Sequence, residues 1–214
     1  MKLLRMLFLA MLSSSVFFAC STNTKSGDEN SENGEVASQA CTYSYNADST
    51  TFKWTAYKYT TRAGVSGTFD GIEVKDTKTS DNKLEVLKGA EFVIDPFSVN
   101  SGNEERDPKV VKYFFGSMAN TDKITGRINM IEGNEASILV TMNDRHVDVI
   151  GHLAVEGNKV TLTAKLDMNT FDAMEAVNAL NQECHDLHTG EDGVSKLWPD
   201  VSIEVSTVLN EACK

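Results

Sequence analysis

The chain has 214 residues, of which 41% are hydrophobic and 24% charged, a composition typical of a soluble globular protein. Its formal net charge is −11, and loss of Lys2 and Arg5 with a cleaved export signal would make it −13. Such an acidic chain lacks the clustered cations that bind phosphate backbones, which argues against nucleic acid as a partner and against general attraction to anionic lipid headgroups.

Residues 1–19 have the pattern of a secretory signal peptide: a cationic start, a short apolar run and a small residue before the expected cut. The apolar run is too short for a membrane-spanning helix, which needs about 20 residues. An ordinary signal-peptidase cut after Ala19 would need a small residue at position 17, where Phe17 stands. This excludes the commonest kind of cut.

The four residues from Phe17 to Cys20 instead resemble the lipobox of bacterial lipoproteins, in which the cysteine is acylated and becomes the new N-terminus. Several acyl chains together hold a protein stably on a membrane. We therefore expect a lipoprotein of the bacterial cell envelope, anchored through Cys20 to the outer membrane and facing the periplasm or the cell surface. The alternative is an unmodified thiol at Cys20.

Residues 20–40 are small, polar and acidic, and contain no aromatic residue. Such a segment cannot bury enough apolar surface to offset the entropy lost on ordering. We expect a flexible tether between the anchor and a single domain at 41–214, a length sufficient for one hydrophobic core.

From residue 52 onward, apolar residues alternate with polar ones, the pattern of strands with one buried face. Asn143-Asp144 and Glu156-Gly157-Asn158 separate neighbouring runs as plausible hairpin turns. Many short strands with tight turns indicate an antiparallel barrel or sandwich. The expected strands cover residues 52–57, 65–69, 72–74, 90–94, 124–130, 138–142, 147–155, 160–166 and 201–207.

Two stretches depart from the alternation and predict short helical insertions. Asp107 and Pro108 are suited to the N-cap and first position of a helix. Residues 172–186 contain no Gly or Pro and carry apolar residues at helical spacing, namely Met174, Val177 and Leu180. The predicted fold class is mainly β: an antiparallel β-barrel of about eight strands with two short helical insertions.

Three cysteines remain if Cys20 is acylated. An exported protein folds in an oxidising compartment, where disulfides persist. Cys41 precedes the first strand-like run and Cys213 follows the last. Since first and last strands are neighbours in a closed antiparallel barrel, we predict a Cys41–Cys213 disulfide across the closing seam, with Cys184 left over. Other pairings stay open, because sequence alone does not determine connectivity.

Four motifs follow one another in the first half of the domain: Phe52-Lys53-Trp54-Thr55-Ala56-Tyr57-Lys58, Val65-Ser66-Gly67-Thr68-Phe69, Ile94-Asp95-Pro96-Phe97-Ser98-Val99-Asn100-Ser101-Gly102, and Arg106-Asp107 leading to Tyr113-Phe114-Phe115. Their order resembles the YceI-like family, secreted proteins with a lipocalin-like barrel. The second half of the domain is similar in strand pattern only, and the segment at 170–198 departs from the family pattern.

The resemblance implies that a long apolar molecule, such as a polyisoprenoid or a fatty amide, binds inside the barrel. A barrel of about eight strands is wide enough for one slender ligand or for side chains alone, so a solid core is the alternative. We expect a non-catalytic carrier that uses no cofactor, with loops near 96–115 and 170–198 around the mouth of the cavity. The expected wall residues are Trp54, Phe69, Phe92, Ile94, Phe114, Val149, Leu153 and Ile203.

Two other functions stay open. Cys184, His185 and His188 offer a thiolate and two imidazoles close together, which could hold zinc or copper in an enzyme or a sensor, although their spacing matches no standard zinc pattern. The acidic surface could instead bind a protein partner. No nucleophile elbow or phosphate-binding glycine loop is present. We therefore predict that the protein is not an enzyme.

Overall fold

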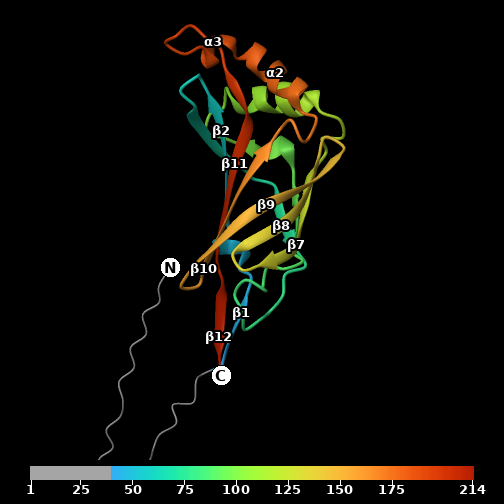
Figure 1. Cartoon of the computed structure of the whole chain (residues 1–214), viewed down its shortest axis with the longest axis vertical. Coiled ribbons are helices and arrows are strands. Elements are labelled where there is room, and N and C mark those ends of the chain that lie inside the picture. Colours follow the sequence, from blue (N-terminus) through green and yellow to red (C-terminus); the bar gives the residue numbers. More distant parts are fainter. Residues whose placement is uncertain (1–39) are drawn as a thin grey trace, which may run out of the picture. The chain divides into compact units, whose positions relative to one another are not determined.

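The computed structural model describes residues 40–214, which belong to one compact unit (Figure 1). The predicted signal peptide at 1–19, the acylation site Cys20 and the tether up to residue 39 lie outside the described residues. Within 40–214, no helix has the length and apolar character needed to cross a membrane.

Most of the domain is one curled antiparallel sheet of ten strands. Its order is β4-β5-β7-β8-β9-β10-β11-β2-β3-β6. Each predicted strand is present, because inward-facing apolar residues alternate with outward-facing polar ones along it. The bounds are β2 Thr51–Lys58, β3 Ala63–Phe69, β4 Ile72–Lys75, β5 Glu91–Ile94, β6 Val99–Asn100, β7 Ile124–Glu132, β8 Glu135–Met142, β9 Arg145–Glu156, β10 Lys159–Asp167 and β11 Leu197–Val208.

The two end strands of this order, β4 and β6, are continuations of strands already inside the sheet. Only Asp70 and Gly71 separate β3 from β4, and the 3₁₀ turn η2 (Pro96–Ser98) separates β5 from β6. Because β3 pairs with β6 and β4 pairs with β5, each pair of segments acts as one bent strand. If β3–β4 and β5–β6 are each counted as one bent strand, the ten strands reduce to eight, and each of the eight pairs with two neighbours. The sequence predicted a barrel of about this number of strands.

The Cys41–Cys213 disulfide is present, but its place differs from the expected seam. Strands β1 (Cys41–Ser44) and β12 (Asn210–Cys213) form a separate two-stranded ribbon beyond one end of the barrel (Figure 1). The seam between the first and last long strands is instead the pairing of β2 with β11. The chain leaves the barrel at Leu209, which is still buried at 3% exposed. Both cysteines belong to the separate ribbon and therefore meet outside the main sheet.

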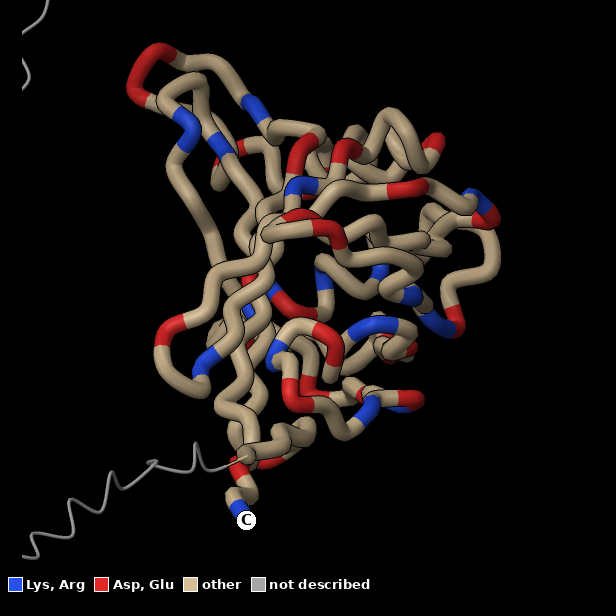
Figure 2. Tube along the Cα trace, turned by 60° about the horizontal axis from the view of Figure 1, so that its bottom comes forward, with Lys and Arg blue, Asp and Glu red and all other residues tan. Residues whose placement is uncertain are grey.

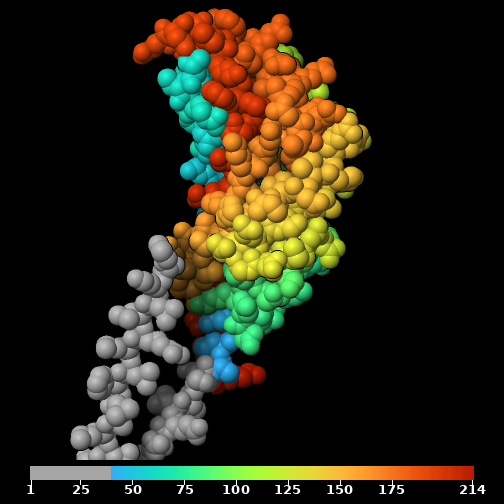
Figure 3. All heavy atoms as spheres, in the orientation of Figure 1, coloured from blue at the N-terminus to red at the C-terminus, as the bar shows by residue number. Residues whose placement is uncertain are grey.

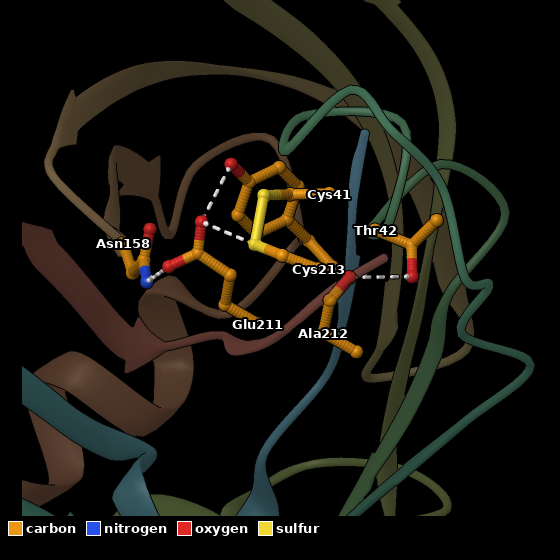
Figure 4. The surroundings of a disulfide bond; sticks show 7 residues. Cys41, Thr42, Asn158, Glu211, Ala212 and Cys213 are labelled. Atoms are coloured by element: carbon orange, nitrogen blue, oxygen red, sulfur yellow. Dashed lines mark hydrogen bonds between the residues drawn. A yellow bond between two sulfur atoms is a disulfide. The ribbon is translucent and has the colours of Figure 1, made fainter. Parts of the chain in front are cut away.

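The ribbon is tied back to the barrel by hydrogen bonds. The backbone N–H of Tyr43 donates to the carbonyl of Ser80 at 2.7 Å, and Ser80 N–H donates back to Tyr43 at 3.0 Å. Beside the disulfide, the Glu211 carboxylate accepts hydrogen bonds from Asn158 Nδ2 at 2.8 Å and from the Tyr43 hydroxyl at 3.1 Å (Figure 4). These two bonds lower the pKa of Glu211 below its usual value, the Asn158 bond contributing most.

Both predicted insertions are helical. The first contains α1 (Asp107–Lys109), a π-helical turn η3 (Val110–Phe114) and a 3₁₀ turn η4 (Phe115–Ser117), and the second contains α2 (Met174–Glu183) and α3 (His185–His188). Residues of α2 contact both η3 and η4. In the space-filling view, the second insertion covers the end of the domain opposite the β1–β12 ribbon (Figure 3).

The predicted helix cap at Asp107 is wrong. Asp107 is the first helical residue, and its carboxylate accepts hydrogen bonds from the backbone N–H of Ser101 at 3.0 Å and from the Ser101 hydroxyl at 2.5 Å. The cap is instead provided by Asn103, whose side-chain oxygen accepts from the backbone N–H groups of Glu105 and Arg106. A turn at 104–106 precedes the helix. The backbone N–H groups that need a cap therefore lie before Asp107, although Pro108 indicated a helix that starts at its own position.

Asn143 joins the two insertions at the turn between β8 and β9. Its φ is +52°, as the predicted two-residue hairpin requires, and asparagine tolerates this conformation well. Its side-chain oxygen accepts from Ala119 N–H at 2.7 Å, while Nδ2 donates to the carbonyls of Phe171 at 2.8 Å and Asp172 at 3.0 Å. One side chain therefore fixes the loops that follow η4 and β10.

Candidate functional site

The inside of the barrel contains a cavity of about 730 Å³ rather than a solid core. This volume lies within the range of pockets that bind small molecules, roughly 300–1,000 Å³. Most of its wall consists of inward-facing side chains of the strands, including Leu197 and Trp198 at the start of β11. The two helical insertions contribute Val110, Phe114, Phe115, Val177 and Leu180. Residues of the connecting segments, among them Tyr45, Leu87 and Met168, complete it.

Seven of the eight expected wall residues line this cavity: Trp54, Phe69, Phe92, Ile94, Phe114, Val149 and Ile203. The eighth, Leu153, is 5% exposed and belongs to the core without being part of the cavity wall. Sequence reasoning missed Val177, Leu180 and Trp198. The helical spacing of Val177 and Leu180 indicated an apolar face, but not that this face closes the barrel.

Backbone contacts and ring packing hold the aromatic part of the wall in place. The indole N–H of Trp54 donates to the carbonyl of Thr68 at 3.0 Å, so the polar edge of this buried ring is satisfied. The Phe69 ring packs against Phe52 and Phe115, with centroid distances of 5.8 and 6.0 Å. Tilted ring pairs of this kind add about 0.5–1.5 kcal/mol beyond the area that they bury. The cavity therefore has a fixed aromatic side.

The wall is apolar apart from a few hydroxyl groups. Thr50 and Thr207 both donate to the carbonyl of Asn46, at 2.8 and 3.1 Å, and their hydroxyl oxygens lie 3.0 Å apart. Asp70 and Glu91 also border the cavity, but Asp70 is exposed and the Glu91 carboxylate pairs with the exposed Arg127. No buried side-chain nitrogen or oxygen in the described part of the chain lacks a hydrogen-bond partner. The interior surface of the cavity is therefore largely apolar.

A family model for the YceI-like domain matches residues 43–209, most of the chain and all strands of the barrel. The chain belongs to the YceI-like domain family. No curated protein matches its sequence.

Several solved structures are similar to this YceI-like domain. A polyisoprenoid-binding domain from Saccharophagus degradans, implicated in plant cell wall breakdown, is 12% identical and has a TM-score of 0.53, covering 82% of this chain and 99% of that one. BcnA from Burkholderia cenocepacia is 16% identical, covers 75% and 96%, and has a TM-score of 0.47. A YceI protein from Campylobacter jejuni is 15% identical, covers 73% and 89%, and has a TM-score of 0.44. At these identities, the first likeness shows the fold alone.

Two of the motifs that resemble the family have structural roles in this YceI-like domain. A Cβ atom on Gly67 would lie 2.4 Å from the Trp54 ring and 2.6 Å from the Asn100 carbonyl, so only glycine fits beneath the indole. At the barrel corner, Asp95 accepts from Phe97 N–H at 2.9 Å, and the Ser98 hydroxyl donates to the Asp95 carbonyl at 2.7 Å. These residues shape the wall and the bend of the barrel.

Trp198, on the cavity wall, is held by a cationic cluster. Its indole N–H donates to the Tyr59 carbonyl at 2.7 Å, and the Arg62 guanidinium lies 4.5 Å from the centre of its ring. Arg62 also donates two hydrogen bonds to Asp200, at 3.1 and 2.6 Å. The Arg62 bonds and a second cation, Lys165, keep the pKa of Asp200 below its usual value. This cluster fixes the ring on one side of the wall.

The alternative metal ligands do not converge. Cys184 is buried and unbonded to sulfur, His188 Nδ1 lies 3.0 Å from Asn181 Oδ1, and His185 Nδ1 lies 3.1 Å from Asp186 Oδ1. Within residues 40–214, the one group of three donors close enough to share an ion is Cys41, Glu211 and Cys213, whose two sulfurs form the disulfide. Burial raises the pKa of the Cys184 thiol, which opposes the thiolate that metals require.

The environment of His188 predicts that the domain loses stability in acid. Burial, assisted by the Lys58 cation, lowers the pKa of His188 from 6.5 to about 4. The unfolded chain therefore takes up a proton between about pH 6.5 and pH 4 that the folded domain does not, so stability falls as the pH falls through this window. We expect His188→Gln to reduce the loss of unfolding free energy between pH 7 and pH 4.5, measured by urea titration at each pH.

The matched control is His146→Gln, because His146 is exposed on β9. It should leave the pH dependence of the wild-type domain unchanged. Equal pH dependence in His188→Gln and wild type would contradict the assigned role of His188.

Proposed function

We propose that this YceI-like domain is a non-catalytic carrier that sequesters one long apolar lipid, of the polyisoprenoid or fatty-amide type, in its barrel. The observation that carries the proposal is the apolar cavity of about 730 Å³ inside the barrel. Each buried methylene is worth about 0.8 kcal/mol, so a long chain binds tightly without a catalytic or charged group. The name of the Saccharophagus degradans domain, which binds polyisoprenoid, supports the same ligand class.

The two insertions support a gate at one end of the cavity. Phe114 from the first and Leu180 from the second both lie on its wall, and Asn143 links the loops beside them. Movement of α2 away from η3 would open this end without breaking any pairing of the barrel strands. Lipid uptake and release then require only the insertions to separate.

The proposed location is the bacterial envelope, with the domain anchored through acylated Cys20. The lipobox-like residues before Cys20 motivate it, and the Cys41–Cys213 disulfide suits an oxidising compartment outside the cytoplasm. Labelled palmitate should be incorporated into the full chain and not into Cys20→Ser. Equal labelling of both would exclude acylation at this cysteine.

Native mass spectrometry tests the carrier function directly. Residues 38–214, the compact unit with its own core and disulfide, would be exported to an oxidising compartment, purified without detergent and weighed intact. We expect one discrete added mass that solvent extracts as a single lipid class. A bare polypeptide mass, together with no uptake of added isoprenoid or fatty amide, would refute the proposal.

A further inference from the structure

We propose that the contact between Phe92 and Gly126 sets the width of the cavity, and that this width lets the barrel accept a methyl-branched isoprenoid chain. Gly126 is thereby a specificity-determining residue of the lipid site. This role rests on the proposed carrier function and deepens it, because it specifies the kind of chain that the carrier takes.

The Phe92 ring covers Gly126 on the inner face of the sheet. The two residues lie directly opposite each other in β5 and β7. A Cβ atom on Gly126 would lie 2.0 Å from Cζ of the Phe92 ring and 2.4 and 2.7 Å from its two Cε atoms. The far end of the ring therefore occupies the place where a side chain at 126 would begin. Phe92 lines the cavity, whereas the buried Gly126 beneath it does not.

The ring explains why a glycine stands in the middle of β7, where it is intrinsically unfavourable. Gly67 beneath Trp54 is a similar case, but a Cβ atom there would also lie 2.6 Å from the backbone carbonyl of Asn100. At Gly126 the three nearest atoms all belong to the Phe92 ring. A side chain at 67 therefore has no space, whereas a side chain at 126 needs only the ring to move.

The free space next to the Phe92 ring is the cavity. The neighbours of Phe92 in register, Val74 and Gly126, belong to the two adjoining strands, and the hollow of about 730 Å³ lies in front of the ring. An alanine at 126 would therefore turn the ring into the cavity and narrow it. Tightly packed surroundings respond to a change of one methylene, so a chain with methyl branches is excluded before a straight chain.

The charged neighbours of the pair lie on the other face of the sheet. Glu91 and Arg127 are opposite each other in the same register, and their side chains form an ion pair of 3.3 Å. Elsewhere on the domain, Lys and Arg are spread among Asp and Glu rather than gathered in one place (Figure 2). The contact of Phe92 with Gly126 therefore acts on the shape of the chain, and uncharged lipids are suitable probes.

The test compares geranylgeraniol with hexadecanol, which has the same number of carbons in its main chain but no methyl branches. Both tryptophans of the chain, Trp54 and Trp198, lie on the cavity wall, so quenching of intrinsic fluorescence reports binding to the delipidated domain. We expect Gly126→Ala to bind geranylgeraniol at least about tenfold more weakly than wild type, the effect of about two methylenes lost from the cavity. Its loss of affinity for hexadecanol should be smaller.

Equal losses for the two lipids would overturn the role of Gly126 in selecting the chain and leave the carrier function standing. Binding of neither lipid to wild type would overturn the carrier function and this role with it.

A second substitution tests whether the ring causes the loss. Phe92→Leu combined with Gly126→Ala removes the ε and ζ atoms that meet the new side chain, so it should recover most of the tenfold loss for geranylgeraniol. The control is Gly64→Ala, the same change at an exposed position of β3, which should bind both lipids as wild type does. Thermal unfolding verifies that each variant is folded. Wild-type affinity in a folded Gly126→Ala domain, or no recovery in the double variant, would refute the role of Gly126.

Discussion

Replacing Ala164 with phenylalanine should weaken lipid binding about a hundredfold while leaving the barrel folded. Ala164 lies on the cavity wall in β10, paired with Gly151 on one side and Ile203 on the other. A phenyl ring at this position projects into space that the lipid chain would occupy. Displacing four methylenes from the cavity costs about 3 kcal/mol, or roughly two orders of magnitude in Kd.

The control is Ala154→Phe, which adds the same side chain at an exposed position of β9. Native mass spectrometry after loading with geranylgeraniol should show bound lipid in the control and not in Ala164→Phe. Thermal unfolding measured on both variants verifies that each is folded. Full lipid occupancy in a folded Ala164→Phe domain would show that the lipid binds outside the cavity.

Removing the disulfide should have the largest effect on stability. Cys41 and Cys213 are 172 residues apart, so the bond restricts nearly the whole unfolded chain. In the loop-entropy model, a ring of this length contributes about 5 kcal/mol. We expect Cys41→Ser with Cys213→Ser to lower the free energy of unfolding in urea by that amount. The ribbon lies outside the main sheet, so the variant should keep the strands of the barrel.

A reducing agent and the free cysteine provide the controls. Reductant should destabilise wild type and Cys184→Ala by the same amount, because Cys184 takes no part in the bond, and should not affect the double serine variant. A loss below about 1 kcal/mol in the double variant would mean that the ribbon frays in the folded domain and does not restrain the chain.

Local chemistry accounts for what could be predicted about the fold. The alternation in segments such as 147–155 required strands with one apolar face, and the turn residues at 143–144 and 156–158 required hairpins between them. The positions of Cys41 and Cys213 at the two ends of the domain indicated the disulfide. The helix cap could not be assigned from the sequence, because Asn103 and Asp107 are both suitable cap residues. In the folded domain the Asp107 carboxylate accepts from Ser101, and Asn103 accepts from the backbone N–H groups at the start of the helix.

The sequence by itself determined that this protein is an antiparallel β fold with apolar residues inside, because strand periodicity and turn chemistry depend on neighbouring residues. Periodicity left a barrel and a sandwich open, and the family resemblance favoured the barrel. Only the tertiary structure decided that the interior is hollow, that Leu153 lies off the cavity wall and that Trp198 lies on it. It also showed that Cys184, His185 and His188 do not share a site. These features depend on the circumference of the closed sheet and on how deeply the insertions reach, which are set by contacts between residues far apart in the chain.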